Sequence, residues 1–112
     1  VLAKGLEYSR ISGGAFDITI EPLSSLWDFT AKDPRVPAAK EIQKDLPKVG
    51  YQNILLEGDQ VTFLNDDTTI DLGAIAKGYI ADEMKAYLEE NGVKSAVINL
   101  GGNILCVGGL PG

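Results

Sequence analysis

The stretch "DLGAIAKGY", residues 71–79, sets where the longest predicted helix of the chain starts. Asp71 precedes five small or apolar positions, and a lysine, a glycine and a tyrosine then lead into a long amphipathic run. Because apolar residues recur about one turn apart and Asn91-Gly92 supplies a stop signal, the run predicts a helix over residues 76–91. The expected core face of this helix comprises Ala76, Ile80, Met84, Tyr87 and Leu88.

The entrance to this helix admits two interpretations. The first turn of a helix has N–H groups without intrahelical partners, and the helix dipole adds about half a positive charge there. Gly73 and Ala74 would let an anion such as phosphate approach the main chain, and Lys77 would add a full charge one turn further on. Alternatively, Asp71 is an ordinary helix cap and Lys77 is a solvated lysine. Spacing alone leaves both open, because the stretch is neither a P-loop nor a dinucleotide-binding glycine motif.

The first half of the chain predicts two helices and one strand. A helix close to the N-terminus ends at Gly13-Gly14. The stretch "AFDITI", residues 15–20, alternates between apolar and polar residues as a strand does. Residues 21–37 predict a turn-rich connection. "AAKEIQKDL", residues 38–46, predicts a short helix that closes near Pro47.

The second half predicts two hairpins around the long helix. Residues 51–65 form the clearest hairpin, with its turn at Gly58. "DDTTIDL", residues 66–72, predicts a turn and a short strand. "SAVINL" and "NILCVG" predict two strands joined at Gly101-Gly102. These elements together predict an α+β fold with mainly antiparallel strands and one long helix.

Composition narrows the classes of function. The chain has 112 residues, which is room for one domain with one core, and its net charge of −6 without a basic cluster argues against nucleic-acid binding. It has no histidine, so imidazole chemistry is excluded. The single cysteine, Cys106, cannot form an internal disulfide and is expected to be a small buried strand residue. The chain starts inside a predicted helix, so we expect it to be a piece of a longer protein.

Two further polar segments are candidates for a binding site. Asp17 lies between bulky apolar neighbours beside two glycines, and it is either a ligand contact or, with Thr19, part of the exposed face of a strand. "NLGGN", residues 99–103, is a glycine-rich turn after an apolar strand. Asp66-Asp67 are interpreted as turn residues rather than a metal pair. Whether these segments share a cleft with the helix entrance stays open at the level of spacing.

Three segments together resemble the ApbE family, the flavin transferases also called FAD:protein FMN transferases. They are "SGGAFDITIEPLSSLW", "IDLGAIAKGYIADEMKAYLEENGV" and "AVINLGGNILCVGG", in this order and at these separations. The resemblance covers nearly the whole chain. It implies that residues 1–112 are the central part of a flavin transferase domain with a T-fold-like architecture, without its N- and C-terminal parts.

The resemblance implies an enzyme that uses FAD as substrate with Mg²⁺, passes FMN to a threonine or serine hydroxyl of an acceptor flavoprotein and releases AMP. An FAD pyrophosphatase giving FMN and AMP, and a non-catalytic flavin-binding envelope protein, are the alternatives. The expected partners include no nucleic acid. The expected location is the bacterial cell envelope, outside the cytoplasm, with membrane contact only through a lipid anchor outside this chain.

The resemblance also implies roles for individual residues. It assigns contacts with the flavin nucleotide to Ala15, Phe16, Asp17, Asp71 and Lys77. It assigns a Mg²⁺ ligand to the main-chain carbonyl of Ala74, which requires regular helix to begin only after Ala74. The remaining metal ligands, an acidic residue and a threonine, would lie in a C-terminal segment beyond this chain. A fragment without them is expected to be a poor catalyst.

Overall fold

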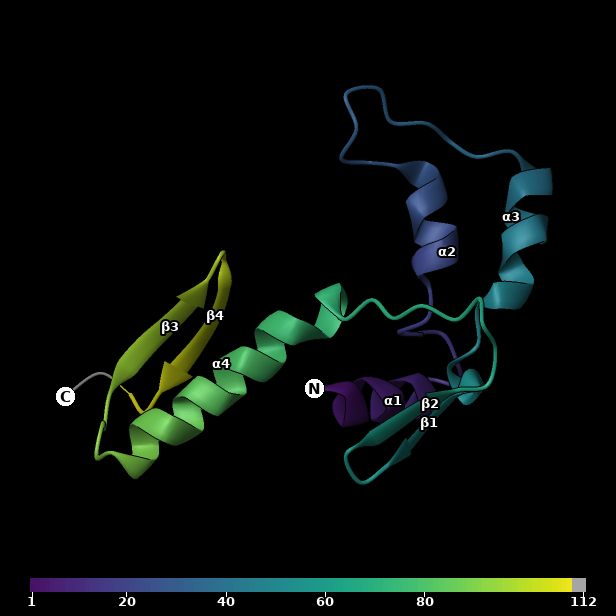
Figure 1. The fold of residues 1–112 in the computed structure, drawn as a ribbon. Coiled ribbons are helices and arrows are strands. Elements are labelled where there is room, and N and C mark those ends of the chain that lie inside the picture. The colour runs from purple at the N-terminus through teal and green to yellow at the C-terminus, as the bar shows by residue number, and fades with distance from the viewer. Residues whose placement is uncertain (110–112) are drawn as a thin grey trace. The chain divides into compact units, whose positions relative to one another are not determined.

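The computed structural model describes residues 1–109, which divide into two compact units. Residues 2–72 form one unit, and the residues from Gly73 onward form the other together with Val1. Figure 1 shows the elements of both. The helices are α1 (Leu2–Ile11), α2 (Glu21–Ser24), α3 (Ala39–Asp45) and α4 (Gly73–Glu90), with 3-10 helices η1 (Ser25–Trp27), η2 (Leu46–Lys48) and η3 (Tyr51–Asn53). The strands are β1 (Ile54–Glu57), β2 (Gln60–Phe63), β3 (Ala96–Leu100) and β4 (Asn103–Val107).

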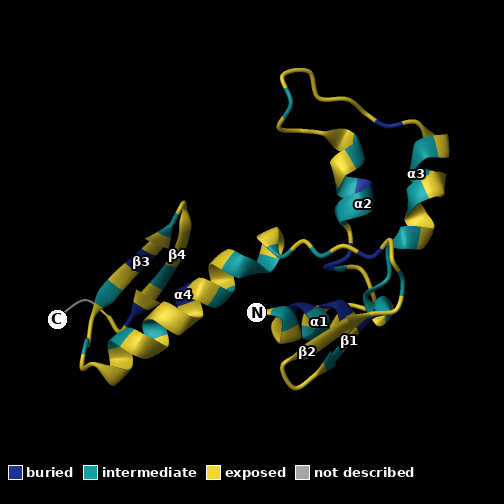
Figure 2. Ribbon diagram, viewed as in Figure 1, coloured by how far each residue is buried: buried dark blue, intermediate teal, exposed yellow. Residues whose placement is uncertain are grey.

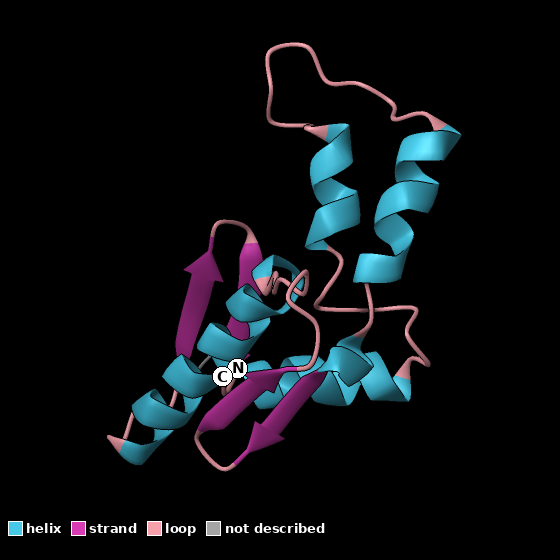
Figure 3. Cartoon of the chain, turned by 45° about the vertical axis from the view of Figure 1, so that its right-hand side comes forward, coloured by secondary structure: helices cyan, strands magenta, loops and turns pink. Residues whose placement is uncertain are grey.

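The strands form two separate antiparallel hairpins, which confirms the predicted fold class of helices with antiparallel strands (Figure 3). In the β1–β2 pair Glu57 lies opposite Gln60, so the two turn residues are Gly58, as predicted, and Asp59. In the β3–β4 pair Leu100 lies opposite Asn103. The expected short strand within residues 66–72 does not form.

The ends of α1 and α4 are built by the predicted glycine stops. Gly13 has φ 63° and Gly92 has φ 83°, a left-handed conformation that glycine adopts without a Cβ penalty. At the end of α4, the Val93 N–H donates to the Leu88 carbonyl at 2.9 Å and the Gly92 N–H donates to the Glu89 carbonyl at 3.1 Å. This pair of bonds is a Schellman motif, which satisfies carbonyls that would otherwise lack partners.

Residues 15–20 do not form the predicted strand but a compact turn. Thr19, expected on an exposed face, is fully buried, whereas Ile20 is 38% exposed. The prediction is wrong because the carboxylate of Asp17 bonds to the backbone two residues on, which replaces a strand ladder with a local turn. The connection after it, predicted as irregular, begins with the helical turn α2, where Pro22 occupies the first turn.

Each unit has its own buried residues (Figure 2). In the second unit Ala81 of α4 packs with Ile98 and Val107 of the β3–β4 hairpin. In the first unit the buried apolar side chains belong to Ile18, Leu23 and Ile54.

The predicted core face of α4 is largely wrong. Ile80, Met84 and Tyr87 are 48%, 41% and 66% exposed, and of the predicted residues only Leu88 packs against the core cluster. The face that packs on the hairpin is centred instead on Ala81, about one residue around the helix. The exposed Ile80, Met84 and Tyr87 line a hollow on the surface of α4. The apolar periodicity therefore predicted the wrong face of the helix.

Cys106 lies on β4 as expected but is exposed, so its predicted burial is wrong. Side chains alternate along a strand, and its neighbour Val107 occupies the buried side. The residues after Asn65 form the predicted turn, since the Asp67 N–H donates to the Asn65 side-chain oxygen at 2.9 Å.

Candidate functional site

Helix α1 packs against Ile18, the residue that follows Asp17. A Cβ on Gly5 would lie 2.8 Å from the Cγ2 of Ile18 and 3.4 Å from the side chain of Leu72, so only glycine lets these apolar groups come this close. One turn along, the buried Ser9 hydroxyl donates to the Gly5 carbonyl at 2.9 Å and accepts from the Ile18 N–H at 3.4 Å. Gly5 and Ser9, two small residues one helical turn apart on α1, therefore hold Ile18 in place.

Asp17 is held by a set of hydrogen bonds inside the same unit. Its Oδ1 accepts from the Thr19 N–H at 2.8 Å and from the Thr19 hydroxyl at 2.6 Å. Its Oδ2 accepts from the Tyr51 N–H at 3.1 Å. The Thr19 hydroxyl in turn accepts from the Gly50 N–H at 2.7 Å. The interpretation of Asp17 as part of an exposed strand face is wrong, because its carboxylate is bonded within a turn. The interpretation as a ligand contact stays a prediction, and Oδ2 retains capacity for one more donor.

Two hydrogen bonds join the first motif segment to the segment before α4. The Asp71 N–H donates to the Ile18 carbonyl at 2.7 Å. The Thr69 hydroxyl donates to the Glu21 carboxylate at 2.9 Å. Asp17 and Asp71, far apart in sequence, are therefore linked through one intervening residue. These two segments, whose proximity the spacing left open, therefore meet within residues 2–72.

The start of α4 differs from the expectation about Ala74. The helix begins at Gly73, so the prediction that regular helix starts only after Ala74 is wrong. In a regular helix the Ala74 carbonyl accepts from the N–H four residues on, at Gly78, and this counts against a carbonyl fully free for a metal. The proposed ligand role of the Ala74 carbonyl stays a prediction.

Lys77 lies beside the third motif segment. A Cβ built on Gly101 would lie 3.1 Å from the Lys77 Nζ, so the lysine ammonium rests against the Gly101-Gly102 turn. The two glycines have φ 62° and 97°, which a two-residue type I′ turn requires at both central positions. The Gly102 N–H donates to the Asn99 side-chain oxygen at 2.8 Å. The second and third motifs thus meet within the second unit, through a pairing that spacing left open.

The exposures of the other predicted residues are mixed. Ala15, Asp71, Ala74 and Lys77 are exposed, whereas Phe16 is half-buried. Gly78 has open space where a Cβ would stand, and so does Gly102. Main chain near Lys77 is therefore accessible to a ligand.

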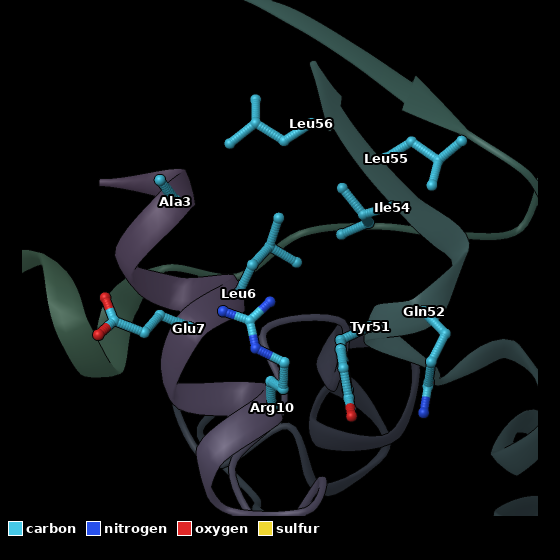
Figure 4. Close-up of a pocket in the computed structure, with 9 residues that line it drawn as sticks. All are labelled: Ala3, Leu6, Glu7, Arg10, Tyr51, Gln52, Ile54, Leu55 and Leu56. Carbon is cyan, nitrogen blue, oxygen red and sulfur yellow. The ribbon is translucent and has the colours of Figure 1, made fainter. Parts of the chain in front are cut away.

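A separate hollow of about 380 Å³ lies between α1 and β1 (Figure 4). Leu6, Ile54 and Leu56 line it with apolar surface, and Arg10 extends its guanidinium into it. None of the predicted site residues lines it. It is distinct from the segment that carries Asp17.

Within residues 1–109, no group of three or more Asp, Glu, Cys or His side chains is arranged to hold a metal ion. Helices of the described part are also too short or too polar to span a bilayer.

The family model described as the ApbE family matches residues 1–112, the whole chain. The chain belongs to the ApbE family. The protein named FAD:protein FMN transferase of Klebsiella pneumoniae (strain 342) is 38% identical over 102 residues, which are 89% of this chain and 32% of that protein. The protein of the same name from Vibrio cholerae (strain O395) is 28% identical over 93% of this chain and 32% of its own length.

Solved ApbE structures show the same fold. The apo form of the flavinyl transferase ApbE of Pseudomonas stutzeri matches with a TM-score of 0.82 and 33% identity, covering 94% of this chain and 34% of that one. The ApbE protein of Thermotoga maritima matches with a TM-score of 0.83 and 30% identity, covering 96% and 36%. The chain spans about a third of the length of the curated relatives it matches.

Sequence reasoning missed Thr19, which it placed on an exposed strand face. The available signal was the pattern Asp-x-Thr, because Asp commonly bonds to the backbone two residues on and a threonine there adds a hydroxyl donor. Gly50 and Tyr51, the distant partners of this pair, gave no signal of their own.

Proposed function

We propose that this chain is part of an enzyme that transfers FMN from FAD to a threonine or serine hydroxyl of an acceptor protein and releases AMP, with Mg²⁺. The observation that carries the proposal is the match of the whole chain to the ApbE family, with relatives named FAD:protein FMN transferase over about nine-tenths of its length. The geometry supports it through the contact of Lys77 with the Gly101-Gly102 turn.

The phosphate groups of FAD would bind at the start of α4. The N–H groups of Ala74 and Ile75 have no partner inside the helix, and the helix dipole favours an anion there. Lys77 adds a full positive charge at this point of a chain whose net charge is −6. Charge-assisted hydrogen bonds of this kind are about twice as strong as neutral ones.

The flavin nucleotide would also contact the turn at residues 15–17. Ala15 is exposed and Phe16 is half-buried, so an aromatic face and main chain are both within reach of a ligand. Asp17 would act mainly by holding this turn, since both of its oxygens already accept hydrogen bonds. Asp71, tied to Ile18, would stand at the polar edge of the same surface.

The fit for Mg²⁺ is partial. The ion takes hard oxygen ligands, and the described residues offer the main-chain carbonyl of Ala74 but no group of three or more acidic side chains arranged to hold it. The remaining ligands in this proposal lie outside the chain. When bound, the ion would offset charge on the pyrophosphate. Mg²⁺ removal by a chelator should abolish transfer while leaving the fold of residues 1–109 intact.

In the proposed reaction the acceptor hydroxyl oxygen forms a bond to the flavin-side phosphorus. The bond from that phosphorus to the bridging oxygen breaks, and AMP leaves with the electron pair. Lys77 and the helix start would stabilise the charge that builds on the leaving phosphate. The hydroxyl proton passes to a base, and none of the residues in this chain can supply it as an imidazole.

The test incubates the full-length protein with FAD, Mg²⁺ and an acceptor protein, and then denatures the mixture. We expect flavin fluorescence to stay with the acceptor and AMP to appear in equal amount. FMN and AMP without labelled acceptor would favour the pyrophosphatase. Saturable FAD binding without AMP would favour a non-catalytic flavin-binding protein.

We also propose a location outside the cytoplasm in the bacterial cell envelope, with a lipid anchor beyond this chain. Cell fractionation of the full-length protein tests this. Recovery in the membrane fraction with release by lipid-anchor cleavage is expected, and recovery in the cytoplasm would contradict it.

A further inference from the structure

Thr19 is fully buried, yet its hydroxyl is at the centre of the hydrogen bonds described above. It donates to Asp17 at 2.6 Å and accepts from the Gly50 N–H at 2.7 Å. One buried hydroxyl thus ties the turn at residues 15–20 to a chain segment about thirty positions away. Such bonds in a dry environment are costly to break, since each partner left behind is unsatisfied.

The same turn controls the main chain of Asp71. Ile18 lies between Asp17 and Thr19, and its carbonyl accepts from the Asp71 N–H at 2.7 Å. The Ile18 N–H is held by Ser9 at 3.4 Å, and its side chain sits against Gly5. Ser9 therefore holds the N–H of Ile18. The Thr19 hydroxyl holds the chain on the C-terminal side of Ile18, through its bonds with Asp17 and Gly50.

We propose that Thr19 is a positioning residue for the nucleotide site, holding Asp17 and, through the Ile18 carbonyl, the Asp71 main chain where FAD binds. The inference rests on the proposed function. Thr19 is buried and would touch neither FAD nor the acceptor. Its effect would reach the ligand through the geometry of the two carboxylate-bearing segments.

The chain offers a matched control at Thr68. Thr68 is also buried, at 6% exposure, but its hydroxyl has no hydrogen-bond partner. Replacing it by valine removes an unsatisfied group at nearly constant shape and should leave stability unchanged or improved. The pair Thr19→Val and Thr68→Val therefore compares the same substitution with and without bonded partners.

The test measures the kinetics of the full-length enzyme. For Thr19→Val we expect KM for FAD to rise about tenfold, equivalent to 1.4 kcal/mol of binding, with kcat changed by less than about twofold. Thr19→Ser, which keeps the hydroxyl, should restore KM, and Thr68→Val should match wild type. A role confined to stability would lower only the folded fraction, so kcat would fall with KM unchanged, and that result overturns the inference.

Direct FAD binding separates this inference from the proposed function. Wild-type protein that binds FAD without transferring FMN overturns the proposed function, and the dissociation constants of the Thr19 variants then decide the inference in place of KM. Wild-type protein that does not bind FAD overturns both. If Thr19→Val does not fold, hydrogen exchange of wild type decides instead. FAD should then slow exchange at the Gly50 and Asp71 amides but not at Val93, and equal exchange with and without FAD overturns the inference.

Discussion

Asp17 and Lys77 carried the same expectation, a contact with the flavin nucleotide, but the structure surrounds them differently. Asp17 is half-buried and accepts hydrogen bonds on both oxygens from Thr19 and Tyr51. Lys77 is exposed, with its ammonium against a bare glycine turn. The difference teaches that a motif can contain residues that build a site beside residues that present charge to the ligand. Substitutions at the first kind should lower stability, and substitutions at the second kind should lower affinity.

The largest effect is expected from Asp17→Ala. It leaves the Thr19 and Tyr51 donors without their acceptor, which should cost about 2–4 kcal/mol in the free energy of unfolding. Chemical denaturation of the full-length protein measures this. Asp66→Ala, at an exposed turn position, is the control and should stay within about 0.5 kcal/mol of wild type. Wild-type stability for Asp17→Ala would mean that the carboxylate is free to serve the ligand.

Gly101→Ala should lower both stability and affinity. A residue with a Cβ at φ 62° is strained by about 1–2 kcal/mol, and the added Cβ would displace the Lys77 ammonium, 3.1 Å away. Gly102→Ala strains the same turn but its Cβ meets no atom within 4 Å. We expect similar losses of stability in both variants and weaker FAD binding only in Gly101→Ala. Equal FAD affinity in the two variants would contradict a contact between Lys77 and FAD.

Lys77→Ala should leave stability unchanged and weaken FAD binding by about 1 kcal/mol or more. The salt dependence of binding should also decrease, because one charge contact is lost. Titration of flavin fluorescence at two ionic strengths measures both. Lys85→Ala, on the same helix, is the control. Unchanged FAD affinity of Lys77→Ala would favour the alternative interpretation, in which Lys77 is a solvated lysine.

The smallest effect is expected at the start of α3, far from the motifs in sequence. The Arg35 guanidinium, hydrogen-bonded to Glu41 at 2.9 Å, lowers the pKa of the Glu41 carboxyl below its usual 4.5, and the Ala38 N–H adds to this. The stabilisation is therefore present above pH 4.5 and lost as the pH falls through the lower folded-state value. Glu41→Gln should barely change thermal unfolding at neutral pH, because the pair is exposed. A large drop would contradict this.

Local signals predicted the elements that local chemistry controls. The glycine stops at Gly13 and Gly92 and the two hairpin turns need only a few neighbouring residues, and all were confirmed. The helix entrance was misplaced by three residues because cap geometry depends on partners that spacing does not reveal.

Tertiary contacts overrode the pattern elsewhere. The alternation in residues 15–20 looked like a strand, but the partners of Asp17 and Thr19 at Gly50 and Tyr51 are distant in sequence. The core face of α4 was misjudged because the residue that the helix buries against the hairpin is the small Ala81, whereas its larger apolar side chains are exposed. The meeting of Lys77 with Gly101 was likewise invisible to spacing.

A structure of the full-length protein with bound FAD tests the central claim most directly. We expect the pyrophosphate oxygens to lie at the start of α4, with the Lys77 ammonium within about 3 Å of one of them and the Asp17 carboxylate still bonded to Thr19. FAD phosphates bound away from residues 73–77, with Lys77 directed into solvent, would contradict it.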